Sequence, residues 1–295
     1  VSDIKSEQKI EPTLAGSAEY GEILLKKLEE KMSNESAKRA VKFIVENSVK
    51  ETDRATYQAM EALIHNLNTM HSRAGAQIPF SSLNYGTDTS EEGRMVMKNL
   101  LLAEEAGLGN GETPIFPIHI FKVKEGINFN KEDINYDLFK LACRVSAKRL
   151  FPNFSFLDAP FNLQYYKEGH PETEATYMGC RTRVVANCYD KSREITYGRG
   201  NLSFTSINLP RIAINANGSI DWFFDELDRK IDLVIDQLLA RYKVQAAKTV
   251  KNYPFLMGQG IWLDSEKLGP NDTVGEVLKH GTLTAGFIGL AECLK

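Results

Sequence analysis

The feature that most constrains the fold of this chain is an alternation of short apolar segments with amphipathic helical patterns. Apolar runs bounded by turn-forming residues are typical of buried strands, and apolar residues spaced three and four apart are typical of helices. Strands that alternate with helices in this way form parallel βαβ units around a buried sheet, so the sequence predicts an α/β fold. Five segments have the pattern of a strand: 76–83, 115–123, 153–157, 202–207 and 283–290.

Helical periodicity accounts for much of the remaining chain. Residues 1–17 are polar without a clear period, whereas an apolar stripe predicts a first helix over 18–32. Ser90 has the character of an N-cap for a helix that ends before the glycines at 107–111. Further helices are predicted over 53–70, 137–150 and 222–247.

No internal repeat or Pro-rich linker separates domains in this sequence. We divide the chain into an N-terminal helical arm, residues 1–50, and an α/β part, residues 51–295. The first residue is Val1 rather than methionine, and an amphipathic pattern is only starting where the chain stops at Leu294 and Lys295. We therefore expect the sequence to be an internal piece of a longer polypeptide.

Charge, hydropathy and cysteine content argue against several classes of protein. The net charge of −3 argues against a protein that binds duplex nucleic acid. No apolar run approaches the roughly 18 residues of a membrane span, and no secretory signal is evident, so we expect a cytoplasmic protein without membrane contact. The five histidines form no metal-binding motif, so we expect no metal site. The four cysteines contain no CxxC pair and are too few for a disulfide framework: Cys143, Cys180, Cys188 and Cys293.

The segment 181–211 differs from the rest of the chain in charge. It has six basic and two acidic residues, a local net charge of +4. Glycines precede Cys180 and flank Arg199, an arrangement that lets a backbone approach a ligand closely. Local positive charge would suit an anionic ligand such as a phosphate ester. A solvated basic hairpin with a structural cysteine explains the same pattern, and from the pattern alone both interpretations stay open.

Five unusual strings stand out along the chain: NYGTDT (84–89), GETPIFP (111–117), YMGCRTR (177–183), GRGNLSFTSINLPR (198–211) and FIGL (287–290). In this order they resemble the catalytic subunit of the anaerobic (class III) ribonucleoside-triphosphate reductases. The similarity runs from about Tyr57 to the last residue, and residues 1–50 match less distinctively.

The resemblance implies a fold and an activity. The fold is a ten-stranded α/β barrel of the type shared by glycyl-radical enzymes and ribonucleotide reductases. It is built from two five-stranded half-sheets, and a loop with a radical cysteine threads its centre. Residues 51–295 would form part of this catalytic barrel. The activity is the reduction of ribonucleoside triphosphates to 2′-deoxyribonucleoside triphosphates by free-radical chemistry under anaerobic conditions.

Three residues match active-site positions of the family. Cys180 matches the cysteine that becomes a thiyl radical and removes the 3′-hydrogen of the ribose. Asn201 matches an asparagine whose amide can bind the sugar hydroxyls while the 2′-hydroxyl is lost. Met178 matches a methionine near the same cavity, where its polarizable thioether can lie beside a radical centre. The presence of both Met178 and Asn201 resembles the branch of the family that uses formate as reductant.

Candidates for binding the triphosphate come from charge and polarity rather than from the resemblance. Basic side chains and loop amides hold phosphate groups in many proteins. The candidates in the basic segment are Arg181, Arg199, Ser203 and Arg211.

The resemblance also implies parts and partners outside these 295 residues. The family stores its radical on a C-terminal glycine and has a four-cysteine structural zinc site, and neither motif occurs in this sequence. It requires an activase with an iron–sulfur cluster and S-adenosylmethionine, and ATP and deoxynucleotides act as effectors. Family members are dimeric, so we expect a homodimer. We expect the segment alone to be inactive.

Two other interpretations remain. The chain could be a non-catalytic nucleotide-binding and dimerisation fragment, or part of a different glycyl-radical enzyme. The segment around Asn201 and the basic loop argue against the second alternative.

Overall fold

The computed structural model describes residues 17–70, 78–179 and 182–295. The chain forms two compact units. Unit 1 comprises Val1–Asn162 together with Gly179–Arg181, and unit 2 comprises Leu163–Met178 together with Thr182–Lys295. Among the described residues, no helix combines the length and the apolar character that a membrane span requires.

The described part of unit 1 begins with two helices that pack against each other, α2 (Ser17–Glu29) and α3 (Asn34–Thr69). The predicted helix over 53–70 is the second half of the 36-residue α3. The Ser33 hydroxyl caps this helix by accepting the Ser36 N–H. The first half shows little apolar periodicity because it buries only Ala37. Residue 50, where we place the end of the N-terminal arm, lies inside α3.

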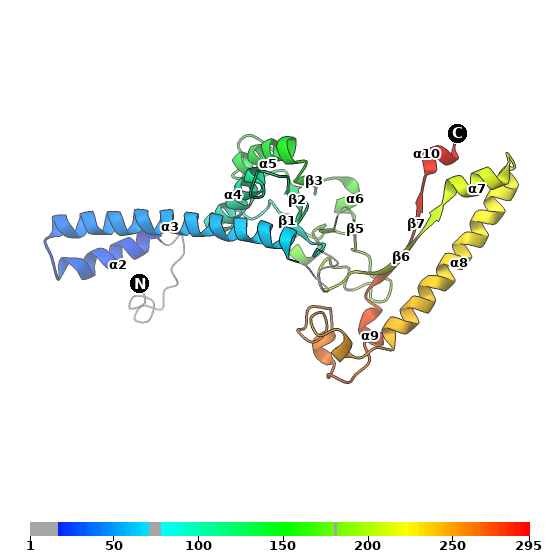
Figure 1. The fold of residues 1–295 in the computed structure, drawn as a ribbon. Coiled ribbons are helices and arrows are strands. Elements are labelled where there is room, and N and C mark those ends of the chain that lie inside the picture. The colour runs from blue at the N-terminus through cyan, green and yellow to red at the C-terminus, as the bar shows by residue number, and fades with distance from the viewer. Residues whose placement is uncertain (1–16, 71–77, 180–181) are drawn as a thin grey trace. The chain divides into compact units, whose positions relative to one another are not determined.

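A three-stranded parallel sheet of order β1-β2-β3 forms the centre of unit 1 (Figure 1). Its strands are β1 (Ser82–Tyr85), β2 (Ile118–Val123) and β3 (Asn153–Phe156). The connections contain α4 (Glu91–Ala106) and α5 (Tyr136–Arg149). The predicted parallel βαβ units, and with them the α/β class, are confirmed.

The core of unit 1 lies between these helices and the sheet. Every residue of β2 is buried, as is expected for a central parallel strand. The buried cluster comprises Met97, Leu101, Phe121, Val123, Leu138, Ala142 and Val145.

Strand β1 lies farther along the chain than the prediction of 76–83. Its pairing starts with Ser82 opposite Ile118 and ends with Tyr85 opposite Phe121. Tyr85 packs against the core, although it belongs to a stretch that reads as a turn in the sequence. Residues 76 and 77 lie outside the described residues.

Unit 2 contains one parallel strand pair and one short hairpin. The parallel pair is β6 (Asn201–Asn208) with β7 (Thr282–Ile288), close to the predicted strands over 202–207 and 283–290. Between them lie α7 (Leu209–Ala216) and the long α8 (Ile220–Ala246), which packs along the pair (Figure 1). The hairpin consists of β4 (Tyr177–Met178) and β5 (Thr182–Arg183).

The rest of unit 2 is held by a small core and by short helical turns. The core comprises Val250, Met257, Trp262, Val274, Val277 and Leu278. The short elements of unit 2 are η1 (Pro171–Thr173), η2 (Val250–Asn252), η3 (Ser265–Lys267), α9 (Gly275–Leu278) and α10 (Leu290–Cys293). The short helix α6 (Pro160–Leu163) contains the last residues of the first segment of unit 1 and the first residue of unit 2.

Candidate functional site

The candidate cysteine stands in the sequence between β4 and β5. Met178 pairs with Thr182 across the hairpin, so Gly179, Cys180 and Arg181 connect the two strands. Cys180 and Arg181 lie outside the described residues. Gly179 has a φ of 56°, in the left-handed region that favours glycine. Its N–H donates a hydrogen bond of 3.0 Å to the Ser82 hydroxyl within unit 1.

Asn201 begins β6 and is held through its side-chain oxygen. Its Oδ1 accepts hydrogen bonds from Oγ1 of Thr284 at 3.1 Å and Oγ1 of Thr282 at 3.4 Å, both on β7. The Nδ2 group forms no hydrogen bond with any of the described residues. Because the side chain is half-buried, this amide can donate to a ligand from a restrained position. An irregularity in the pairing with β7 follows Asn201, and such bulges re-aim side chains.

The Met178 side chain lies close to Gly200, the residue that precedes Asn201. A Cβ on Gly200 would lie 3.9 Å from the Met178 sulfur and 3.6 Å from the Trp262 ring, so the thioether and the indole both lie at van der Waals distance from this glycine. Met178 and Gly200, the residue that precedes Asn201, are therefore neighbours in unit 2.

Arg199 is buried, and its guanidinium binds backbone carbonyl groups. Its nitrogens donate to the carbonyl oxygens of Val185, Ala186, Ile195 and His280 at 2.7–3.0 Å. These bonds use four of the five guanidinium N–H groups. Burial lowers the pKa of Arg199 from its ordinary value. The arrangement makes Arg199 the anchor of the segment that precedes β6, and substrate contact stays a prediction for this residue.

Ser203 interacts with a residue that sequence reasoning missed. Nη1 of Arg241, on α8, donates to the Ser203 hydroxyl and to the Phe204 carbonyl, both at 3.1 Å, and lies 3.3 Å from Oγ1 of Thr205. No sequence signal singles out Arg241, because it lies 38 residues from Ser203 on a helix rich in charged side chains.

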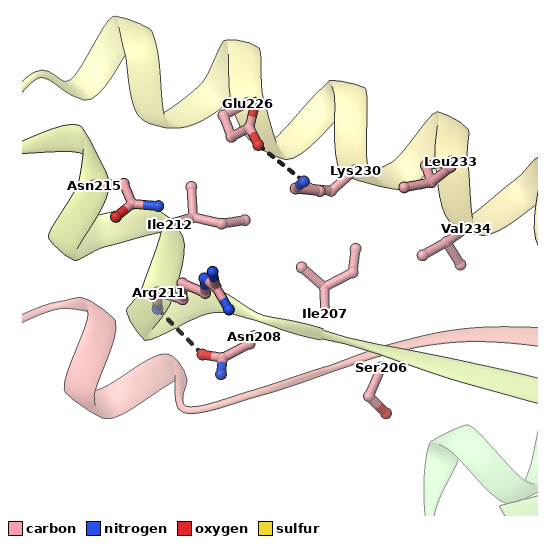
Figure 2. A pocket seen from close by; sticks show the side chains of 10 residues that line it. All are labelled: Ser206, Ile207, Asn208, Arg211, Ile212, Asn215, Glu226, Lys230, Leu233 and Val234. Carbon is pink, nitrogen blue, oxygen red and sulfur yellow. Dashed lines mark hydrogen bonds and ion pairs between the residues drawn. The ribbon is translucent and has the colours of Figure 1, made fainter.

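Arg211 lies near the opposite end of β6 from Asn201. Its backbone N–H donates to Oδ1 of Asn208, the N-cap of α7. At about 3.3 Å per residue, Asn208 lies about 23 Å along the strand from Asn201. The Arg211 side chain extends into a hollow of about 370 Å³ between β6, α7 and α8 (Figure 2). Lys230 also lines this hollow and forms an ion pair with Glu226 at 3.1 Å. The structure therefore separates Arg211 from the residues around Asn201.

Part of the local positive charge is neutralised inside the fold. Arg193 forms ion pairs with Asp190 at 2.6 Å and with Asp264 at 2.8 Å. The pKa of Asp264 is well below its ordinary value, chiefly because Arg193 and then Lys267 donate to its carboxylate. Asp264 also lies 3.1 Å from Nε2 of the buried His280. The charge pattern of the segment thus reflects an internal network as well as any ligand site.

Comparison with known proteins connects this arrangement to one family. The family model "Anaerobic ribonucleoside-triphosphate reductase" matches residues 25–295. The anaerobic ribonucleoside-triphosphate reductase of Escherichia coli is 31% identical over 246 residues, and that of phage T4 is 32% identical over 251. Each comparison covers 82% of this chain, but only 33% and 40% of the relatives, so the chain spans well under half of their length.

Solved structures also match. The anaerobic ribonucleotide reductase from Thermotoga maritima with citrate in the active site superposes with a TM-score of 0.44 at 13% identity, over 81% of this chain and 40% of that one. The family model and the curated relatives confirm the family predicted from the five strings. The chain belongs to the anaerobic ribonucleoside-triphosphate reductase family.

Proposed function

We propose that the complete protein reduces ribonucleoside triphosphates to 2′-deoxyribonucleoside triphosphates, with Cys180 as the residue that attacks the ribose. The observation that carries this proposal is the proximity of Met178, two residues before Cys180 in the chain, to Gly200, the residue before Asn201. The names of the relatives support the substrate class. This chain would then supply part of the catalytic α/β barrel.

The proposed chemistry starts at the sugar. The Cys180 sulfur, as a thiyl radical, takes the 3′-hydrogen atom of the ribose and becomes a thiol. The 2′-hydroxyl then leaves as water after it gains a proton. Formate supplies two electrons and is oxidised to carbon dioxide, and the 3′-hydrogen returns from the thiol to the sugar. The net reaction consumes one formate and one proton for each deoxynucleotide, water and carbon dioxide formed.

Asn201 would stabilise charge that shifts between the sugar hydroxyls. Two threonine hydroxyls hold its carbonyl oxygen, so the Nδ2 group is oriented before substrate binds. A donor held in place in this way costs little reorganisation during the reaction. Met178 would place a polarizable sulfur beside the reacting centre.

The candidate triphosphate contacts differ in their support. Arg181 follows Cys180 directly in the chain, and Ser203 is two residues from Asn201. We propose these two as contacts to the substrate. We assign Arg199 to holding the loop, because its N–H groups bind carbonyl oxygens. Arg211 would bind a different part of the ligand or a different ligand, because it follows Asn208, which is about 23 Å along the strand from Asn201.

Activity would require components beyond the described residues. The family relationship implies a glycyl radical that regenerates the cysteine radical, an iron–sulfur activase that forms it, and a structural zinc site. It also implies ATP and deoxynucleotide effectors, a homodimer and a cytoplasmic location.

The decisive experiment uses the complete protein with activase, S-adenosylmethionine and formate under anaerobic conditions. Cys180→Ser should abolish deoxynucleotide formation, while nucleotide binding and the glycyl-radical signal in electron paramagnetic resonance persist. Asn201→Ala should lower kcat by about 100-fold with little change in KM, the typical cost of losing one preorganised donor. Asn271→Ala, at an exposed position of unit 2, is the matched control. Reduction that survives in Cys180→Ser would refute the proposal.

A further inference from the structure

Gly179 is held at two points by residues that precede or begin β1. Its N–H donates to the Ser82 hydroxyl at 3.0 Å, in a partly buried setting. The Phe80 ring packs against its α-carbon so closely that a Cβ on Gly179 would lie 2.8 Å from Phe80 Cε1. Phe80 in turn packs edge-on against Phe116, with ring centroids 4.9 Å apart. These contacts all lie within unit 1, to which Gly179 belongs.

The hydrogen bond between Gly179 and Ser82 joins residues that are far apart in the sequence. Ninety-seven residues separate donor and acceptor, so the bond does not arise from a local turn. The Ser82 backbone meanwhile pairs with Ile118 in the sheet. A strand of a parallel sheet is a rigid support compared with a loop. The hydroxyl is therefore a fixed acceptor for the Gly179 N–H.

We propose that Ser82 is a positioning residue for the reactive cysteine. Its hydroxyl holds the amide of Gly179, the residue that directly precedes Cys180 in the chain. Consecutive α-carbons are only about 3.8 Å apart, so fixing one residue limits where the next can lie. This inference rests on the proposed function of Cys180.

The expected consequence is a loss of turnover rather than of binding. A misplacement of about 1 Å at a reacting centre can cost about 100-fold in rate. Removal of the hydroxyl should therefore lower kcat between about 10-fold and about 100-fold, with KM for the nucleotide unchanged within about twofold. The yield of glycyl radical should stay the same, because Ser82 does not take part in its formation.

The test compares Ser82→Thr with Ser82→Val in the complete protein. Both side chains are β-branched and suit a strand, and they differ mainly in the hydroxyl. Ser82→Thr should retain the wild-type kcat, and Ser82→Val should show the loss. Ser82→Ala provides a smaller side chain if valine prevents folding. Ser81→Ala is the matched control, because among the described residues the Ser81 hydroxyl binds the nearby Pro79 carbonyl alone, at 3.4 Å.

A second readout does not depend on catalysis. The rate at which iodoacetamide alkylates Cys180, measured by mass spectrometry of its peptide, should rise about fivefold in Ser82→Val and Ser82→Ala. Fivefold is the factor that corresponds to one hydrogen bond of about 1 kcal/mol. Ser82→Thr and Ser81→Ala should react like the wild type.

The two proposals fail in different ways. If Ser82→Val and Ser82→Thr show the same kcat and the same alkylation rate, the positioning role of Ser82 is wrong, whatever Cys180 does. If Cys180→Ser still reduces nucleotides while alkylation responds to the hydroxyl, the role of Cys180 is wrong and the restraint on the loop is supported.

Discussion

Arg199 is the residue for which structure and charge pattern suggest different roles, and a substitution can separate them. As a substrate contact, Arg199 would keep its N–H groups available to a phosphate. In the structure they bind four backbone carbonyl oxygens in a side chain that is 7% exposed. We predict that Arg199→Lys destabilises unit 2 strongly, whereas Arg211→Lys, at an exposed position, does not.

The magnitude follows from the geometry. A lysine retains the charge but donates from a single nitrogen, so it can replace about two of the four hydrogen bonds that Arg199 makes to carbonyl oxygens. A buried carbonyl left without a donor costs about 1–3 kcal/mol. Two such groups predict a loss of about 3 kcal/mol. For Arg211→Lys we expect a change within about 0.5 kcal/mol, as for most surface substitutions.

Tryptophan fluorescence in urea measures this difference selectively. Both tryptophans of the chain, Trp222 and Trp262, lie in unit 2, and Trp262 is part of its core. With a slope of about 2 kcal/mol per molar urea, the midpoint for Arg199→Lys should fall by about 1.5 M. A midpoint equal to that of Arg211→Lys, together with a raised KM for the nucleotide, would refute the structural role and support substrate contact.

Three further predictions concern stability. Arg149→Met should destabilise unit 1 by about 3 kcal/mol, because the Arg149 guanidinium binds carbonyl oxygens at the end of α4. Arg144→Met removes an exposed ion pair with Glu105 and should cost less than about 1 kcal/mol. Hydrogen exchange of the β2 amides measures both changes. Leu101→Ala, in the core of unit 1, should cost about 2–5 kcal/mol by the same measurement, and a value below about 1 kcal/mol would contradict the packing described. The pKa of Asp190 is lowered to about 2, chiefly by the Ser192 hydroxyl, so its carboxylate stabilises unit 2 above about pH 4 and this contribution is lost as the pH falls towards 2. Asp190→Asn should therefore flatten the acid side of the stability profile measured by tryptophan fluorescence, and an unchanged profile would show that the interaction is absent.

The local spacing of apolar residues was sufficient to predict the class of fold and its main helices and strands. The period of apolar residues predicted β2, α5 and α8 almost within their observed bounds, because each buries one face or one whole strand. The same pattern missed the first half of α3, which buries little and depends on its cap and on helix propensity. It also missed α7 and the two-residue strands of the hairpin, which are too short to show a period.

The family, too, followed from the sequence alone, because unusual strings in a fixed order need no coordinates to be identified. What only the tertiary structure decided is how the polar residues of those strings are used. Residue type states that Arg199 and Asn201 can donate and accept hydrogen bonds, but not with whom. Three of their partners, the His280 carbonyl and the Thr282 and Thr284 hydroxyls, lie about eighty residues away. Such bonds exist only because β6 and β7 pair in the fold, so the choice of partner depends on which segments become neighbours in space.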